Sequence, residues 1–262
     1  MVQFLKMNII KKIHIFPIKG FSYQSHEAIS LEKGEVINGD REYAFAKDSI
    51  QFDPDNPKYF SKRNFLALVK DERLAELNTS FEKQSCQWTI KIKNKIIAKW
   101  ILDNEECHAA ESYLKNFLNL PNDQKITLVR ANGGTKKHSF SDVPDKAISL
   151  INLQSIRDLE SKINKDIDPC RFRSNIYFES DRPWIEFDWL GQELHIGRAI
   201  LKVFKRTKRC AATMVNPNNA TRDINIPKDL KRYYNHIDMG IYAEVVQGGD
   251  IQVDDLIKIK LN

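Results

Sequence analysis

The chain has 262 residues, of which 42% are apolar and 29% are charged. An apolar content near the globular average argues against wholesale disorder, and a chain of this length buries a sufficient core without disulfides. The four cysteines are far apart and lack the paired spacing that builds zinc or iron–sulfur sites, which indicates reduced thiols in a reducing compartment. We therefore expect a folded protein of one large or two small domains.

Charge and N-terminal composition bear on partners and location. The 41 lysines and arginines exceed the 35 acidic residues and leave a formal charge of +6, which indicates an anionic partner such as nucleic acid or a phosphorylated cofactor. Lysines at positions 6, 11 and 12 interrupt the first apolar residues, and no later segment approaches the ~20 apolar residues of a membrane span. We expect a cytoplasmic protein with no membrane partner.

Alternating apolar residues predict a β-rich first half of the chain. The expected strands are 12–16, 42–46, 65–69, 88–92 and 96–102. The last two are joined by a turn at 93–95. One helix is expected to follow them, because Asp103 or Asn104 can cap its first turn and Pro121 ends the apolar stripe.

The second half mixes strands with two further helices. A helix is predicted over 153–163, with Asn152 as its cap, and another begins near Pro227, where proline costs no hydrogen bond. The expected strands are 126–129, 175–178, 184–187, 194–196, 199–205, 241–246 and 256–259. The last two strands are expected to be joined across Gly248–Asp250.

Many short strands with three scattered helices predict a mainly β fold. We expect a β-barrel with a few helices, preceded by a smaller β-rich domain. The predicted boundary assigns residues 1–122 to the N-terminal domain and residues 123–262 to the barrel domain.

Common catalytic signatures are missing from the sequence. The ten glycines form neither a phosphate-binding loop nor a dinucleotide fingerprint, which disfavours P-loop and Rossmann chemistry. The six histidines show no metal-binding spacing among themselves, and no Gly-x-Ser-x-Gly elbow supports a serine hydrolase. The chemistry must therefore be sought elsewhere.

Three basic clusters stand out from the dispersed lysines. They are Lys19–Gly20 with Gly39–Arg41, the segment 168–175, and the segment 202–213. Arg173 and Asn175 would face the same way on an extended chain, a charged donor beside an amide that suits a phosphate or a planar heterocycle. Pairing of these arginines with the acidic residues Asp168 and Glu186 is an equally good explanation, and spacing does not decide between them.

Cys210 is the most informative single residue. It follows Lys208 and Arg209, and a cationic surrounding favours the thiolate, which attacks electrophiles and binds soft metals. A single free cysteine is more often a small core residue, so two interpretations of Cys210 remain open at this point.

Several segments, in order along nearly the whole chain, resemble one family. They are Arg209–Pro217, Arg222–Pro227, Gly240–Val245, Asp168–Ile176, Ser149–Leu159, Trp184–Gly197 and Gly249–Asp255. Together these segments resemble the MOSC domain, named for the C-terminal domain of molybdenum cofactor sulfurases. The segments Phe16–Gly20 and Gly39–Arg41 resemble the β-domain that precedes MOSC in amidoxime-reducing and N-hydroxylaminopurine-detoxifying proteins.

The resemblance implies a molybdenum–molybdopterin cofactor (Moco) held between the two domains. It implies that Cys210 is the catalytic thiolate that binds molybdenum. It further implies that a set of polar residues holds phosphate, pterin or metal-bound oxygen: Lys19, Arg41, Ser155, Arg173, Asn175 and Arg209. Family-level descriptions also include pyridoxal phosphate binding.

By the same resemblance, the expected activity is reduction of a small N-hydroxylated compound, such as an amidoxime or an N-hydroxylated base. Electrons would come from a separate donor, a reductase, flavoprotein or ferredoxin-like protein. This chain departs from the family pattern at three places: Gly20 replaces a serine, Ser174 replaces a proline, and Asn216–Ala220 replaces Asp-Pro-x-Thr-Gly.

Two other functions compete with a reductase. Cys210 could carry a persulfide or transfer the cofactor without turning over a substrate. Alternatively, the segment 202–209 could bind nucleic acid, but Phe204 is its one possible stacking aromatic, whereas nucleic-acid barrels use several. We therefore expect no nucleic-acid partner.

Overall fold

A computed structural model describes residues 8–47, 50–132 and 138–259 of the chain. Within them, seven strands close a barrel in the order β10, β9, β13, β12, β11, β15 and β1, with β1 pairing back to β10. The barrel strands are β1 (Asn8–Ile15), β9 (Ile148–Asn152), β10 (Ile176–Glu179), β11 (Glu193–Ile196), β12 (Ala199–Lys208), β13 (Asp238–Gln247) and β15 (Leu256–Ile259). Only β9 and β10 pair in parallel among these neighbours.

The barrel interior follows from the period-two pattern of its strands. On β12, Ala199, Leu201 and Val203 are fully buried, while the residues between them are half-buried or exposed. Leu150 of β9 and Ile241 of β13 belong to the same apolar cluster. Such alternation fixes the register, because a slip by one residue would turn the apolar face outward.

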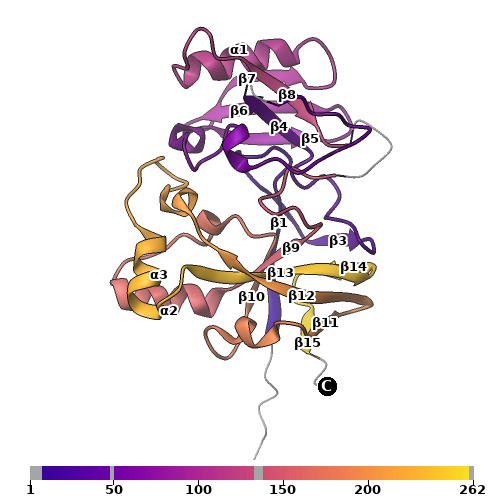
Figure 1. Ribbon diagram of the computed structural model, residues 1–262, viewed down its shortest axis with the longest axis vertical. Helices are drawn as coiled ribbons and strands as arrows, with labels where there is room; N and C mark the ends of the chain where they lie inside the picture. Colours follow the sequence, from indigo (N-terminus) through magenta and orange to yellow (C-terminus); the bar gives the residue numbers. More distant parts are fainter. Residues whose placement is uncertain (1–7, 48–49, 133–137, 260–262) are drawn as a thin grey trace, which may run out of the picture.

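Short elements extend the barrel and cover its outside. Strand β2 (Gln24–His26) pairs with β1, and β3 (Ala28–Leu31) pairs with β14 (Gly249–Gln252). Helices α2 (Leu153–Ile163) and α3 (Ile226–Tyr234) lie together on one side of the barrel (Figure 1). The single-turn 3-10 helices on this part of the chain are η3 (Pro169–Phe172), η4 (Ile185–Trp189) and η5 (Ala211–Met214).

A second, smaller unit lies beside the barrel, at the top of Figure 1. It holds the pair β4 (Tyr43–Lys47) and β8 (Ile126–Arg130), and the sheet β5 (Asn78–Glu82), β6 (Gln87–Ile92) and β7 (Lys95–Ile101). Helix α1 (Cys107–Phe117) packs on β7 and β8, and η1 (Lys62–Asn64) and η2 (Glu72–Glu76) lie in the connections. Trp88, Phe45 and Phe21 meet at the centre of its own core.

The structure confirms the mainly β class, the barrel and the three α-helices within the described residues. Asn152 caps α2 as predicted, since its side chain accepts a hydrogen bond from the Gln154 amide at 3.0 Å. The boundary between residues 122 and 123 stays a prediction. The strand pairing also shows that β1 belongs to the barrel. The described part of the chain therefore runs from the barrel into the smaller unit and back again.

Two strand predictions and one turn prediction were wrong. Within 65–69, Phe65 makes an isolated bridge to Ala46 and no strand forms. Residues 184–187 turn into η4, because Trp184 adopts a left-handed φ of 63° that ends any extended run. Residues 249–252 are not a simple turn but form β14, which pairs with β3. No helix among the described residues is long and apolar enough to cross a membrane.

Candidate functional site

A cavity of about 270 Å³ lies where the barrel meets the smaller unit. Its basic lining residues are Lys19, Arg41, Lys62, Arg171, Arg173, Lys205, Arg206, Lys208 and Arg209. Asp142 is the one acidic residue among the described residues that line it. Such an excess of positive charge in a partly enclosed space favours an anionic ligand.

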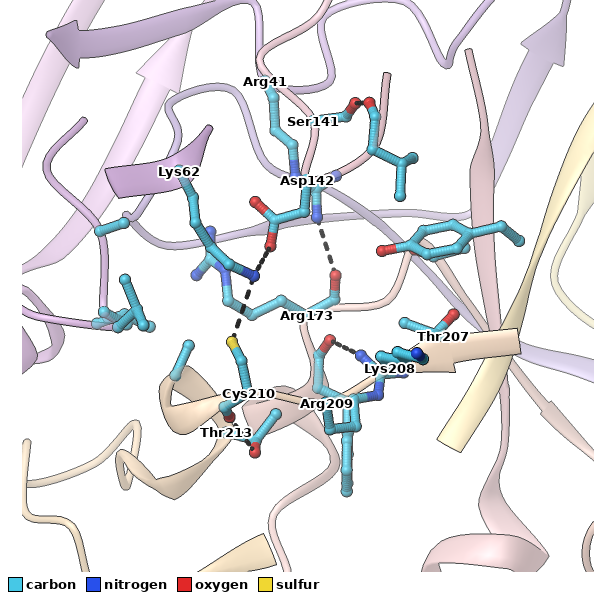
Figure 2. A pocket seen from close by; sticks show the side chains of 18 of the residues that line it. Arg41, Lys62, Ser141, Asp142, Arg173, Thr207, Lys208, Arg209, Cys210 and Thr213 are labelled. Atoms are coloured by element: carbon cyan, nitrogen blue, oxygen red, sulfur yellow. Dashed lines mark hydrogen bonds and ion pairs between the residues drawn. The ribbon is translucent and has the colours of Figure 1, made fainter. Parts of the chain in front are cut away.

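Cys210 lies at the floor of this cavity, between the end of β12 and the start of η5. Its backbone is extended, and its carbonyl accepts a hydrogen bond from the Thr213 hydroxyl at 2.8 Å. The Sγ atom is 3.3 Å from the Lys62 Nζ atom (Figure 2). The thiol is thus half-buried and faces an ammonium group from the other unit, rather than packing in the apolar core.

Arg209 is buried beneath the cavity, and part of its guanidinium has no protein partner. Nε donates to the Met239 carbonyl at 2.8 Å, and Nη1 donates to the Phe172 carbonyl at 2.9 Å. The Nη2 atom is buried and has no hydrogen-bond partner among the described residues. Burial lowers the pKa of Arg209. An unused buried donor of this kind costs free energy unless a ligand accepts from it.

Arg173 and Arg41 form the upper wall of the cavity. The Arg173 Nη1 atom donates to the Phe21 carbonyl at 2.7 Å, and its guanidinium lies 4.3 Å from the Phe16 ring centroid. Burial, aided by Arg41, lowers the pKa of Arg173 to about 10. Arg41 donates to the Arg173 carbonyl at 3.0 Å and pairs with Asp40. Burial is the largest single effect and opposes the charge, but Asp40, Asp142 and Tyr242 together outweigh burial and raise the pKa of Arg41.

Pairing of Arg173 with Asp168 or Glu186 is not observed, although the neighbouring Arg171 pairs with a different acid, Asp223, at 2.6 Å. The Asp168 carboxylate caps η3 by accepting from the Cys170 amide at 2.8 Å. Glu186 accepts hydrogen bonds from Ser155 and Asn152 instead. Among the described residues, neither acid pairs with Arg173, which leaves the anionic-ligand interpretation as the better one.

Asn175 lines the cavity, but its side-chain amide forms its hydrogen bonds with residues of the barrel. Its Oδ1 atom accepts from the Ser149 hydroxyl at 2.8 Å, and its Nδ2 atom donates to the His14 carbonyl at 3.2 Å. These bonds hold β9, β10 and β1 together directly beneath Arg173. Asn175 therefore supports the cavity through the backbone it orders.

Lys19, Asp142 and Lys62 form a chain of charges that ends at the thiol. Lys19 Nζ lies 2.7 Å from Asp142 Oδ1, and Lys62 Nζ lies 3.2 Å from Asp142 Oδ2. Burial opposes ionisation of all three groups. The two lysines nevertheless hold the pKa of Asp142 well below its ordinary value, and Asp142 with Cys210 raises the pKa of Lys62.

Lys62 and Asp142 were missed by the sequence analysis. Both lie in irregular segments, 80 residues apart in the chain, and neither belongs to a basic cluster or a motif. Their contact depends on how the connections cross between the two units. No local pattern in the sequence could have revealed it.

Ser155 lies away from the cavity, unlike the other predicted site residues. It is fully buried on α2, where its hydroxyl donates to Glu186 at 2.8 Å and accepts from the Trp184 amide at 2.8 Å. Ser155 is not among the residues that line the cavity. The face of α2 that carries Ser155 packs against η4, so its hydroxyl orders that turn.

The departures at Gly20 and at the loop after Cys210 have local explanations. Gly20 has a φ of +89°, and a Cβ atom there would lie 2.8 Å from the Leu66 carbonyl oxygen. Serine would not fit this position without a shift of the backbone. The loop closes on itself, because Ala220 N donates to the Asn216 carbonyl and Asn216 Nδ2 donates to Asp223.

Comparison with known families gives one match. Residues 135–258 match the family model of the MOSC domain. No curated protein matches the sequence. Among solved structures, YuaD from Bacillus subtilis is 11% identical, with 97% of each chain covered and a TM-score of 0.44. YiiM from Geobacillus stearothermophilus is 16% identical over 44% of this chain, with a TM-score of 0.35. The match spans 54% of the YiiM chain.

Proposed function

Because this chain carries a MOSC domain over residues 135–258, we propose that it binds a molybdenum–molybdopterin cofactor in the cavity of Cys210. We further propose that it reduces small N-hydroxylated compounds with electrons from a separate donor protein. The observation that carries the proposal is a cysteine thiol at the floor of a cavity in which buried guanidinium and ammonium groups converge.

The residues present suit this group. A phosphorylated pterin is anionic and planar. The cavity offers the unused Nη2 donor of Arg209, the buried charge of Lys19 and the half-buried charges of Arg41 and Arg173. Arginine binds phosphate and planar rings through the same flat array of donors. A thiolate is the ligand type that suits a soft metal.

Each residue then has a defined part. Cys210 is the proposed protein ligand of molybdenum. Arg41, Arg173 and Arg209 hold the pterin and its phosphate. Lys19, from the smaller unit, adds a positive charge to the cavity wall. The bound cofactor supplies the electron transfer that removes oxygen from nitrogen, and the protein supplies position and electrostatic field.

The charge chain from Lys19 to Lys62 has a further part in this proposal. Conversion of N–OH to N–H consumes an electron pair and a pair of protons and releases water. Lys62 keeps its proton at neutral pH, because Asp142 and Cys210 raise its pKa against the effect of burial. Its ammonium group is thus held beside the thiol, where it orients an anionic or hydroxylated ligand.

Activity of the purified protein tests this function. The protein is produced in a host that makes the cofactor and is mixed with a chemical electron donor and benzamidoxime. Benzamidine should form with the wild type and not with Cys210→Ala. Molybdenum binding without reduction of amidoximes or N-hydroxylated bases would instead support the competing function, a cofactor or sulfur carrier.

A further inference from the structure

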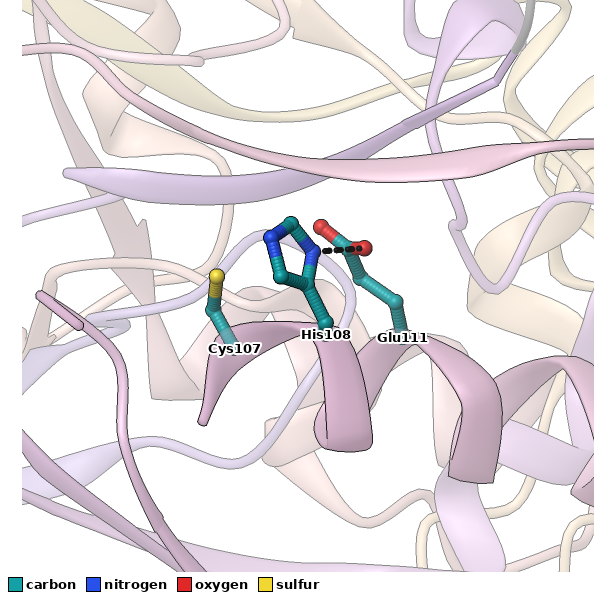
Figure 3. Close-up of side chains that lie close together, drawn as sticks. All are labelled: Cys107, His108 and Glu111. Carbon is teal, nitrogen blue, oxygen red and sulfur yellow. Dashed lines mark hydrogen bonds and ion pairs between the residues drawn. The ribbon is translucent and has the colours of Figure 1, made fainter. Parts of the chain in front are cut away.

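The first two turns of α1 carry three different metal-binding groups. We propose that Cys107, His108 and Glu111 bind a divalent cation, with zinc as the preferred ion. Figure 3 shows the three side chains rising from the same side of the helix. None of them lines the Cys210 cavity, so this site is independent of the proposed function.

The distances are close to those of a metal site. One ligand atom from each residue lies within 4.8 Å of the other two. His108 Nδ1 and Glu111 Oε2 are 3.1 Å apart. Two ligands at roughly 2.0–2.2 Å from a tetrahedral zinc ion are separated by roughly 3.3–3.6 Å, so a cation could replace the proton these atoms share. The Cys107 sulfur lies within 4.8 Å of both other ligand atoms, and the proposed site requires its side chain to turn toward them.

Helical spacing explains why the three groups meet. Cys107 and Glu111 are four residues apart and His108 and Glu111 are three apart, the two separations that bring side chains onto neighbouring positions of one helix face. The sequence has neither histidines spaced for a shared metal ion nor paired cysteines. A mixed Cys-His-x-x-Glu pattern matches neither of these two signatures.

One ligand is already held in place. Glu111 Oε1 accepts a hydrogen bond from the Leu128 amide of β8 at 2.7 Å, and its side chain is only 15% exposed. A backbone donor of this kind orients a metal ligand in the same way as the outer hydrogen bonds of known sites. His108, at 74% side-chain exposure, is free to adjust to the ion. The bound ion would therefore fasten the start of α1 to β8.

Charge and donor type select the ion. The start of a helix repels an isolated cation, but a thiolate and a carboxylate neutralise a dication, so the loaded site carries no net charge. Sulfur and imidazole donors favour zinc over magnesium or calcium, which prefer oxygen. Three protein ligands leave one position of a tetrahedral ion to water.

Cobalt and zinc titration of the reduced, chelator-treated full-length protein tests the site. Cobalt(II) should bind at one equivalent and produce a thiolate-to-metal absorption band, which zinc then abolishes. The band should be absent in Cys107→Ser and should persist in the matched controls Cys86→Ser and Cys210→Ser. His108→Ala, a change at an exposed position, should weaken zinc binding by about tenfold or more.

Two results would overturn the proposal. One is cobalt binding without a thiolate band in the folded wild-type protein. The other is a band that survives in Cys107→Ser and disappears in Cys210→Ser, because the metal would then occupy the cavity of the proposed cofactor. Molybdenum content and reductase activity decide the proposed function separately, and neither depends on Cys107.

Discussion

At the scale of single residues, the side chains that line the cavity differ in how many of their hydrogen-bonding groups already have protein partners. Arg209 uses two of its nitrogens on the carbonyls of Met239 and Phe172 and leaves the third pointing at no protein group among the described residues. The side-chain amide of Asn175 is already hydrogen-bonded to the Ser149 hydroxyl and the His14 carbonyl. The first residue is thus available to a ligand, and the second supports the wall behind it.

Gly20 offers a test of the backbone next to Lys19. Gly20→Ser should lower the free energy of unfolding in two ways, by about 1–2 kcal/mol for the left-handed backbone and about 1–3 kcal/mol for the contact with the Leu66 carbonyl. Urea unfolding measures the change. Gly34→Ser is the matched control, because Gly34 has a φ of +71° but nothing within 4 Å of the added Cβ. Equal losses in the two variants would show that Gly20 is not sterically required.

His14 makes stability depend on pH. Burial, with a smaller effect of Lys12, lowers the pKa of His14 from 6.5 to about 4. Between these values the unfolded chain binds a proton that the folded protein excludes, so folding becomes less favourable as pH falls. The loss from His14 should reach about 3 kcal/mol near pH 4. Urea unfolding at several pH values should show a smaller loss in His14→Phe; identical slopes would contradict this assignment.

The site residues that could be predicted from the sequence lie within recognisable basic segments. Arg173 and Arg209 come from two such segments, and both line the cavity with Cys210. Lys62 and Asp142 could not be found, because isolated charged residues in irregular segments are ordinarily solvated. Ser155 has the residue type of a ligand-binding hydroxyl, but the direction of its side chain depends on the packing of α2 against η4.

At the scale of elements, long strongly patterned segments were predictable and short apolar runs were not. The apolar stripe and the Asn152 cap define α2, and alternation defines β6 and β12. Strand β9 was missed because all five of its residues are buried and therefore show no alternation. Residues 184–187 have the composition of a strand, and only tertiary packing turns them into η4.

One arginine joins the loop after Cys210 to the smaller unit. Arg222 donates to the Ala211 carbonyl at 2.7 Å, to the Leu68 carbonyl at 2.9 Å and to Glu72 at 3.1 Å. Arg222→Ala should cost about 2–3 kcal/mol of stability, because it leaves these acceptors without their charged donor.

Hydrogen exchange locates the effect of Arg222. Amides in residues 66–74 and 211–214 should exchange faster in Arg222→Ala than in the wild type. Lys228→Ala, at an exposed position on α3, is the control and should leave both segments unchanged. Faster exchange confined to other parts of the chain would show that Arg222 does not join the two units.

At the scale of the whole molecule, the path of the chain creates the site. Strand β1 closes the barrel, the chain then builds the smaller unit, and β9 returns to the barrel. Lys19, Arg41 and Lys62 therefore come from segments outside the barrel strands, and Arg173, Arg209 and Cys210 come from the barrel side. The many short strands of the sequence predicted a barrel, whereas the return of the first strand to that barrel required the structure.

Molybdenum and pterin content is the most direct test of the central claim that Cys210 and its cavity hold Moco. Both are measured in protein purified from a host that makes the cofactor. The control Cys170→Ser should contain as much molybdenum and as much pterin as the wild type. Cys210→Ser should contain less molybdenum per bound pterin than the wild type. A wild-type protein that contains neither, purified from a host that loads a known MOSC protein, would contradict this claim.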